Sequence, residues 1–339
     1  MDLEDFSFSL PDNLIAKWPL TDRVQSKLLV LDKDEEDLKE DIFKNLCSFL
    51  DEEYFLVMNN AKVNKARLFG KKRTGGKVEI LLVKKINDYE YTALIKGKVR
   101  DKEVVYINEN ITLSIMHNTS GNLHRVVFNE LPGESVMEDF GTIPIPPYLK
   151  RSAESIDYDY YQTVYAKNPG SIAAPTAGLH FDRNLIMNLK NQGIETLEIT
   201  LNVSYATFNP IAERDINKHI MHRETYFIDK TTKEKINSLK RKGKKLLAIG
   251  TTVVRALEDA ADDFGLISKD GLLETSLYIK PGYRFKIVDA IITNFHLPRS
   301  SLFILVSAFC GLDFLKSAYK YGVENNYRFY SYGDGMLIK

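Results

Sequence analysis

Residues 170–181, GSIAAPTAGLHF, carry no charged side chain and bring a histidine, His180, to the end of a small-residue stretch. Glycines permit backbone conformations that other residues resist, and Pro175 stiffens the middle, so the loop exposes backbone polar groups to a ligand. Asp182 is placed to cap a following helix, which puts His180 near the positive end of a helix dipole. Imidazole titrates nearest neutrality, so His180 is an acid/base candidate; the alternative is a packed histidine in a tight connection.

Residues 248–258, AIGTTVVRALE, read as a strand, a glycine and the start of a helix. Unpaired N–H groups at a helix N-terminus, together with Thr251, Thr252 and Arg255 one turn along, suit a carboxylate or phosphate. The alternative is a pair of capping hydroxyls and a surface arginine. Neither G-x-G-x-x-G nor G-x-x-x-x-G-K-[ST] occurs, which argues against dinucleotide-binding and P-loop folds.

Two further segments carry polar side chains of interest. In TNFHLPRSS, Asn294 and His296 end a predicted strand, where polar groups gather in open α/β sheets. The tail YRFYSYGDGMLI adds Arg328, Asp334 and several tyrosines; such tails usually pack into cores, but their rings also suit a stacked base or a cation.

The segment KHIMHRE places His219 and His222 three residues apart, with Glu224 two further on. On a helix the two imidazoles would share a face, and zinc binding is conceivable. The segment is not H-E-x-x-H, and no third ligand is obvious, so we expect no metal site.

The elements that position these residues are of two kinds. From Thr74 to about Glu130, β-branched and aromatic residues alternate with polar ones between turn signals, which predicts a compact all-β unit, a small barrel. The prolines of residues 143–151 predict an extended linker. After Gly170, helices are predicted over 183–192, 231–243, 251–261 and 301–310, with strands over 195–203, 245–250 and 285–295.

This alternation predicts an α/β multi-layer domain with an inserted all-β barrel. We expect residues 1–60 and 151–339 to form a discontinuous α/β catalytic domain and residues 61–150 the inserted domain. The 339 residues suffice for two domains, and 44% hydrophobic and 27% charged residues are ordinary for a globular protein.

Charge and cysteine content restrict the function classes. The chain has 46 basic and 46 acidic residues, whereas domains that bind nucleic acid through phosphates usually have a pI above about 9, so any such role needs local patches. Cys47 and Cys310 match no metal spacing and predict buried free thiols.

The N-terminus lacks the layout of a signal peptide, and the apolar run Ser301–Leu312 is about half as long as a membrane span. We therefore expect a cytoplasmic protein.

Basic side chains cluster at residues 62–73 (KVNKARLFGKKR) and 240–245 (KRKGKK). Lysine runs of this kind are usually solvated faces. The first cluster, however, lies at the entry to the predicted β insert, where it can follow a nucleic-acid backbone.

The segments PGSIAAPTAGLHF, HIMHRE, GTTVVRALE, YIKPGYRFKIVDAIITNFHLPRSSLFILVSAFCG and YRFYSYGDGMLI occur in this order, preceded by FSFSLPDNLIAKWPL, ARLFGKKRTGGKVEILL and YQTVYA. Together they resemble the S-adenosylmethionine:tRNA ribosyltransferase-isomerase family of queuosine biosynthesis over essentially the full length. The resemblance implies transfer and isomerisation of the ribosyl unit of S-adenosylmethionine onto 7-aminomethyl-7-deazaguanine at the tRNA wobble position. Epoxyqueuosine forms, and adenine and methionine leave. The family fold is similarly an α/β domain with an inserted β-barrel, and no metal or other cofactor is expected; we also expect a monomer.

Such a reaction requires groups that hold a sulfonium and a carboxylate, move protons and exclude water. The catalytic candidates are His180, His296 and Asp334. The substrate-binding candidates are Gln162, Ser171, Pro175, Thr176, Gly178, Glu224, Thr251, Thr252, Arg255, Asn294 and Arg328. The tRNA-binding candidates are Lys62, Lys65, Arg67, Lys71, Lys72 and Arg73.

Two segments depart from the family's pattern. TLNVSYATF, residues 200–208, stands where the family reads something like THVGAGTF, so Asn202 replaces a histidine and the SYA triplet adds bulk. In NNAKV, Ala61 and Lys62 replace a Thr-Arg pair, and lysine cannot reproduce an arginine fork. The alternatives are a diverged relative with another acceptor, a catalytically silent tRNA-binding protein and, more remotely, a zinc hydrolase built on HIMHRE.

Overall fold

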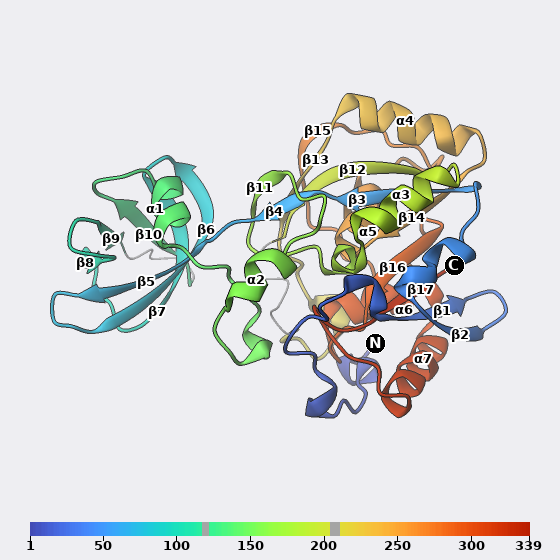
Figure 1. The fold of residues 1–339 in the computed structure, drawn as a ribbon, viewed down its shortest axis with the longest axis horizontal. Helices are drawn as coiled ribbons and strands as arrows, with labels where there is room; N and C mark the ends of the chain where they lie inside the picture. Colours follow the sequence, from blue (N-terminus) through green and yellow to red (C-terminus); the bar gives the residue numbers. More distant parts are fainter. Residues whose placement is uncertain (117–121, 204–210) are drawn as a thin grey trace.

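The computed structural model describes residues 1–116, 122–203 and 211–339. Figure 1 shows a large mixed sheet flanked by helices, with a small closed barrel standing to one side. The predicted combination of an α/β structure and an all-β barrel is therefore confirmed. The predicted domain boundaries stay a prediction.

The large sheet has nine strands in the order β15-β13-β12-β3-β14-β16-β17-β1-β2. Its centre is parallel from β12 to β16, and β1 is parallel to β17, whereas β16–β17 and the outer pairs are antiparallel. The strands are β1 (Lys27–Asp32), β2 (Asp37–Ile42), β3 (Tyr54–Asn59), β12 (Glu195–Asn202), β13 (Glu224–Ile228), β14 (Lys245–Ile249), β15 (Gly271–Thr275), β16 (Ala290–Asn294) and β17 (Gly335–Ile338). A separate parallel pair joins β4 (Ala61–Val63) to β11 (Asn168–Ser171).

Both faces of the sheet are covered, which explains why its central strands are continuously apolar. All six residues of β3 are buried; Phe55 and Val57 pack into one core, and Leu56 and Met58 pack into another on the opposite face. Helix α3 (Arg183–Asn191) covers the second face. The first face is covered by α4 (Lys230–Arg241), α5 (Thr251–Ala260), α6 (Ser301–Cys310) and α7 (Leu312–Glu324).

The helices begin where capping chemistry predicts. Asp182 accepts a hydrogen bond from Leu185 N at 2.6 Å at the start of α3, and Ser300 accepts one from Phe303 N at 3.2 Å at the start of α6. In the described residues no single helix is long and apolar enough to cross a membrane; α6 and α7 reach that length only as a pair bent by 115°.

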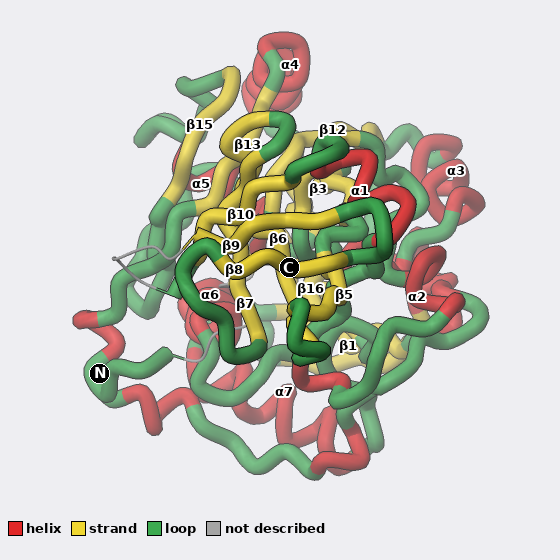
Figure 2. Tube along the Cα trace, turned by 90° about the vertical axis from the view of Figure 1, so that its left-hand side faces the viewer, coloured by secondary structure: helices red, strands yellow, loops and turns green. Residues whose placement is uncertain are grey.

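The barrel closes in the order β10-β7-β6-β5-β8-β9 and has its own apolar core. Figure 2 views the molecule from the barrel side. The strands are β5 (Arg67–Lys72), β6 (Lys77–Asn87), β7 (Glu90–Lys96), β8 (Glu103–Tyr106), β9 (Thr112–Met116) and β10 (His124–Phe128). Helix α1 (Gly133–Phe140) packs Val136 and Met137 into this core. The alternation that begins at Thr74 thus predicts all but the first strand, β5.

Several local predictions are wrong because tertiary packing decides them. Residues 143–151 are not a free linker, since they contain the short 3-10 helix Pro147–Leu149 and bury Ile143, Ile145 and Leu149 against the body. The strand predicted over 285–295 is limited to β16. Cys310 is buried as expected, but Cys47 is only partly buried.

Other short elements complete the chain. Helix α2 (Ser155–Tyr160) follows the proline-rich segment. Further 3-10 helices in the described residues are Leu3–Phe6, Asp12–Leu14, Arg23–Gln25, Phe43–Phe49, Thr176–His180 and Ile216–Lys218.

Candidate active site

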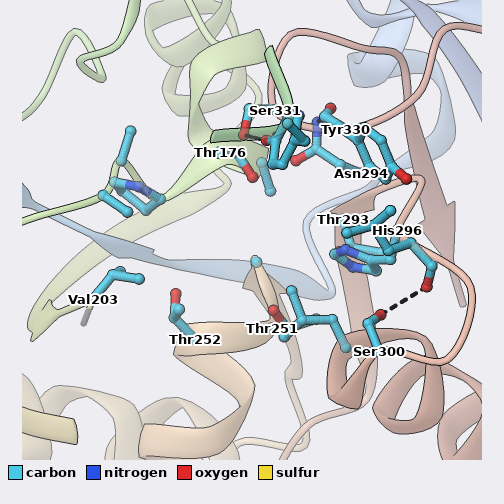
Figure 3. A pocket seen from close by; sticks show the side chains of 18 residues that line it. Thr176, Val203, Thr251, Thr252, Thr293, Asn294, His296, Ser300, Tyr330 and Ser331 are labelled. Carbon is cyan, nitrogen blue, oxygen red and sulfur yellow. Dashed lines mark hydrogen bonds between the residues drawn. The ribbon is translucent and has the colours of Figure 1, made fainter. Parts of the chain in front are cut away.

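A pocket opens where β14 and β16 end. These strands are parallel neighbours, so their last residues, Ile249 and Asn294, reach the same edge of the sheet, where ligands bind in open α/β folds. Figure 3 shows the side chains that converge there. The pocket is lined by Tyr148, Ala173, Ala174, Pro175, Thr176, Ala177, Val203, Gly250, Thr251, Thr252, Thr293, Asn294, His296, Leu297, Ser300, Leu302, Tyr330 and Ser331.

Sequence analysis placed part of this set at a binding site. The predicted residues that line the pocket are Pro175, Thr176, Thr251, Thr252, Asn294 and His296. They come from three segments: the 3-10 helix after β11, the start of α5, and the segment after β16. Their convergence follows from the parallel pairing of β14 with β16.

Two threonines stand at the first turn of α5. Gly250 precedes them with φ of +95°, a conformation that favours glycine, and its N–H donates to Ile292 O at 2.7 Å. The chain thereby turns sharply from β14 into the helix. Thr251 and Thr252 consequently bring hydroxyls to the pocket beside the positive end of the helix dipole.

Asn294 connects the pocket to His180 through a directed chain of hydrogen bonds. Its side-chain Nδ2 donates to Tyr330 O at 3.2 Å and to His180 Nε2 at 3.1 Å. Because Nε2 then accepts, the imidazole proton lies on Nδ1, 2.8 Å from Ser26 Oγ. The Ser26 hydroxyl in turn donates to Arg23 O at 2.9 Å. The network therefore fixes both the histidine tautomer and the orientation of the Asn294 amide.

The other side-chain atom of Asn294 is an unused acceptor. The residue is 2% exposed and lines the pocket, and its Oδ1 makes no hydrogen bond to any described residue. A buried acceptor without a partner costs about 1–3 kcal/mol. Asn294 Oδ1 is therefore suited to accept a hydrogen bond from a ligand.

His180 is enclosed rather than presented to the pocket. Its ring stacks on Phe43 with centroids 4.1 Å apart and planes 9° from parallel. Burial, reinforced by the positive charges of Arg328 and Arg23, lowers the pKa of His180 to about 3. The imidazole is thus neutral, with both nitrogens engaged.

His296, by contrast, lines the pocket itself. Its Nε2 lies 2.8 Å from Thr293 Oγ1, and its backbone N–H donates to Tyr319 Oη at 2.7 Å. Burial lowers the pKa of His296 to about 3, so this imidazole is also neutral.

Two tyrosines line one side of the pocket; sequence analysis pointed to the tyrosines of the tail but not to Tyr148. The rings of Tyr148 and Tyr330 lie 4.7 Å apart and 45° from parallel. Tyr148 Oη is hydrogen bonded to Ser331 Oγ, and burial raises the pKa of Tyr148 to about 12. The available signal was a tyrosine inside the proline cluster and the tyrosine-rich tail. Ser26, from the N-terminal segment, gave no such signal.

Glu224 and Arg255 lie outside the residues that line the pocket. They form a buried ion pair with each other, and Arg255 Nε donates to Leu277 O at 3.1 Å. The HIMHRE segment that leads to Glu224 is not a helix, because the 3-10 helix ends at Lys218 and β13 begins at Glu224.

Asp334 is likewise tied to the protein backbone. Its Oδ1 accepts from Lys27 N at 2.9 Å, and its Oδ2 accepts from Arg328 N at 2.7 Å. Burial raises the pKa of Asp334 despite these bonds. Arg328 donates through Nη2 to Tyr332 O at 2.7 Å and lines a smaller hollow beside His180.

Gln162, Ser171 and Gly178 shape the surroundings of the site. Gln162 exchanges two hydrogen bonds with the backbone of Val63, at 2.7 and 3.0 Å. Ser171 Oγ donates to Ala173 O at 2.7 Å and accepts from Val203 N at 3.0 Å, which holds the floor of the pocket in place.

Only part of the departure at residues 200–208 lies within the described structure. Asn202 ends β12 and packs against Gly170, where an added Cβ would come 3.0 Å from Asn202 Nδ2. Ser204, Tyr205 and Ala206 lie outside the described residues.

The tRNA-binding candidates differ in their surroundings. Lys65 pairs with Glu138 at 2.8 Å, and Arg67 pairs with Glu79 at 3.3 Å. Lys72 Nζ donates to Lys98 O at 2.8 Å. The exposed members are Lys62, Lys71 and Arg73.

Comparison with known proteins assigns the chain to a family. The model of a family described as queuosine biosynthesis protein matches residues 3–338. The chain belongs to this family. The chain is also similar to proteins named S-adenosylmethionine:tRNA ribosyltransferase-isomerase. The one from Aquifex aeolicus is 47% identical and the one from Caldanaerobacter subterraneus is 43% identical, each over 100% of both chains.

A solved structure has the same fold. The crystal structure of S-adenosylmethionine tRNA ribosyltransferase from Thermotoga maritima is 30% identical, with a TM-score of 0.56, over 99% of this chain and 100% of that one. Within the described residues no cluster of three or more His, Cys, Asp or Glu side chains could hold a metal ion.

Proposed function

We propose that this chain transfers and isomerises the ribosyl moiety of S-adenosylmethionine onto 7-aminomethyl-7-deazaguanine at the wobble position of tRNA. The product is epoxyqueuosine-tRNA, and adenine and methionine are released. The observation that carries this proposal is family membership across residues 3–338, with full-length relatives of that name. We also propose that the enzyme works as a cytoplasmic monomer without a metal.

The chemistry of the pocket supports S-adenosylmethionine as the ribosyl donor. Small residues at its base, such as Ala173 and Ala174, leave room for a flat nucleoside. The Thr251 and Thr252 hydroxyls at the start of α5 suit a methionine carboxylate. The aromatic faces of Tyr148 and Tyr330 suit a sulfonium cation, because a ring face attracts positive charge.

Asn294 and His296 are the polar groups that we place against the reacting nucleoside. Asn294 Oδ1 is a buried acceptor without a partner among the described residues, so it suits a ribose hydroxyl or an exocyclic amine. His296 lines the pocket as a neutral imidazole, so it can accept a hydrogen bond from substrate.

The geometry favours a positioning role for His180, because both its nitrogens are engaged and it holds the Asn294 amide. Asp334 and Arg328 also have a positioning role, because their hydrogen bonds fix the C-terminal segment that carries Tyr330. The buried pair of Glu224 and Arg255 joins β13 to α5, the helix whose first residues line the pocket.

The test is a direct assay of both products. Purified protein is mixed with S-adenosylmethionine and tRNA that carries 7-aminomethyl-7-deazaguanine; free adenine is quantified, and the modified nucleoside is identified by mass spectrometry. We expect adenine and epoxyqueuosine in equal amounts. tRNA with guanine at the wobble position is the matched control and should give neither product.

Adenine release without epoxyqueuosine would instead support a diverged relative with another acceptor. Binding of tRNA without adenine release would support the alternative of a catalytically silent tRNA-binding protein. An Asn202→His variant, which restores the family residue, would show whether the departure at that position limits turnover.

A further inference from the structure

The outer face of the barrel carries a groove that is separate from the pocket of the α/β body. It lies over the adjacent strands β7, β6, β5 and β8. Figure 2 shows the strands of the barrel in front of the α/β body. The groove is lined by Phe69, Gly70, Lys71, Lys77, Val78, Glu79, Lys96, Gly97, Tyr106, Ile107, Asn108 and Glu109.

Two aromatic rings border the groove and remain in contact with solvent. Phe69 is 53% exposed and Tyr106 is 38% exposed. Tyr106 is the cross-strand partner of Lys71, and Phe69 lies two residues before Lys71 on the same face of β5. Both rings therefore point outward from neighbouring strands, where packing within the barrel does not require an aromatic side chain.

Positive charge is concentrated on the same face. Lys71 and Lys77 are directly opposite each other in the β5–β6 ladder, an arrangement that is unfavourable unless an anion lies nearby. Residues 61–106 contain 13 basic and 5 acidic residues, whereas the whole chain contains 46 of each. Of the two acidic residues that line the groove, Glu79 and Glu109, Glu79 is paired with Arg67 at 3.3 Å and with Lys96 at 3.8 Å.

Two glycines let the backbone under the groove pack closely. A Cβ at Gly70 would lie 2.5 Å from Val105 Cγ1 and 2.9 Å from Tyr106 O, so only glycine lets β5 and β8 approach this closely. Gly97 has φ of +134°, and an added Cβ there would lie 3.1 Å from Lys77 O. A larger residue at Gly70 or Gly97 would therefore displace the backbone that lines the groove beside the two rings.

We propose that this groove binds an unpaired nucleotide of tRNA, with Phe69 and Tyr106 contacting the base and Lys71 and Lys77 the flanking phosphates. Exposed rings beside lysines are the combination by which proteins hold single-stranded nucleic acid without reading its sequence. An acidic peptide would use the lysines but gives no reason for two exposed rings. The inference rests on the proposed function, because that function supplies tRNA as the partner.

The test is equilibrium binding of fluorescently labelled unmodified tRNA, measured by anisotropy at several salt concentrations. Phe69→Ala and Tyr106→Ala should each weaken binding about 5- to 150-fold, the loss of one base–aromatic stack, without changing the salt dependence. Phe69→Trp should restore affinity. Lys71→Gln combined with Lys77→Gln should reduce the slope of log K against log salt by about 1.4–1.8.

The matched control is Tyr89→Ala, which removes a ring 43% exposed at the opposite end of β6 and should bind like the wild type. Unchanged affinity in Phe69→Ala, or an equal loss in Tyr89→Ala, would overturn the proposal. A ten-residue oligouridylate should show the same ranking of variants. Product formation by the wild-type protein, assayed on its own, separates failure of this proposal from failure of the proposed function: unchanged tRNA affinity in Phe69→Ala, while the wild-type protein forms epoxyqueuosine, overturns only the groove.

Discussion

At the scale of single residues, the surroundings of His180 determine what its imidazole can do. A base must have a free nitrogen, yet Nδ1 lies against Ser26 and Nε2 accepts from Asn294. Releasing Nε2 would leave the Asn294 amide without one of its two acceptors. The residue is therefore best suited to hold Asn294 Oδ1 toward the pocket, and its influence on catalysis passes through that amide.

A Ser26→Ala substitution tests this chain. Without Ser26 Oγ the Nδ1–H has no acceptor, so the other tautomer becomes competitive and would aim a proton at Asn294 Nδ2. We expect kcat/KM for S-adenosylmethionine to fall about 5- to 10-fold, the worth of one hydrogen bond. Ser26→Thr, which keeps the hydroxyl, should recover activity. Loss of thermal stability with an unchanged kcat/KM would show that the chain only supports the fold.

The two buried histidines also predict how stability depends on pH. The pKa values of His180 and His296 are about 3 in the folded protein, against an ordinary value of 6.5. The unfolded chain therefore binds more protons between pH 6.5 and 3, so stability falls as the pH falls through this window. Between pH 7 and 5 we expect a loss of about 2 kcal/mol for each histidine.

Urea unfolding at pH 7 and pH 5 measures this loss. His296→Gln should remove about half of the difference in the free energy of unfolding. His222→Gln, at an exposed histidine, serves as the comparison. An equal pH dependence in all three proteins would mean that other groups dominate acid destabilisation.

The sequence was informative for residues that follow strands and less so for residues brought in from a distance. Asn294 and His296 were recognisable because they end an apolar run at the binding edge of a sheet. Tyr148 and Ser26 were not, because only the tertiary fold brings Tyr148 to Tyr330 and Ser26 to His180. Asp334 and Glu224 were placed at the reaction centre as charged groups, but their bonds to backbone and to Arg255 satisfy them elsewhere.

At the scale of elements, the small residues of the segment 170–181 have a packing purpose as well as a ligand-facing one. An added Cβ at Gly178 would overlap Tyr165 Oη and come 2.8 Å from Thr163 Cγ2. The 3-10 helix Thr176–His180 therefore lies closely against the segment 163–165. This contact sets the position of Thr176 at the pocket and of His180 behind it.

Gly178→Ala should consequently destabilise the protein by about 1–3 kcal/mol, the usual cost of overpacking. The hydroxyl of Tyr165 is buried with no hydrogen-bond partner among the described residues, so Tyr165→Phe alone should be nearly neutral. Combining the two should recover part of the loss, because the overlapping oxygen is gone. Chemical unfolding of the four proteins forms a double-mutant cycle. Additive effects would contradict the packing argument.

Element prediction succeeded where local chemistry sufficed. Asp182 and Ser300 cap the helices that their positions predicted, and the alternation after Thr74 gave five of the barrel's strands. It failed for residues 143–151, where prolines predict extension but burial of Ile145 and Leu149 folds the chain onto the body. Strand β5 escaped notice because lysine and glycine interrupt its pattern.

At the scale of the whole molecule, the two ends of the chain share one sheet. Strand β17, near the C-terminus, lies between β1 and β16, and Lys339 N donates to Leu31 O at 3.0 Å. No local pattern specifies this pairing, because it joins residues some 300 positions apart in sequence. The tyrosine-rich tail reaches the pocket through the same arrangement, since Tyr330 and Ser331 lie just before β17.

The barrel and the body are joined by two adjacent segments whose approach is unusually close. Arg67 and Thr142 exchange backbone hydrogen bonds at 3.2 and 2.8 Å, and Gly141 lies beside them. A Cβ at Gly141 would overlap the carbonyl oxygens of Lys65 and Met137. The separation of the barrel groove from the pocket is therefore set at a point where only glycine fits.

Gly141→Ala should push the two segments apart and displace the barrel relative to the pocket. A tRNA that contacts both would then be misaligned, so we expect KM for tRNA to rise about 10-fold or more while KM for S-adenosylmethionine stays the same. Tyr89→Ala is the control on the same barrel, because it removes a ring that is 43% exposed and lies outside the junction. Steady-state kinetics with each substrate varied in turn makes the comparison. If KM for S-adenosylmethionine rose in parallel, the junction would be supporting the pocket itself, and the barrel would not be acting as a separate platform for tRNA.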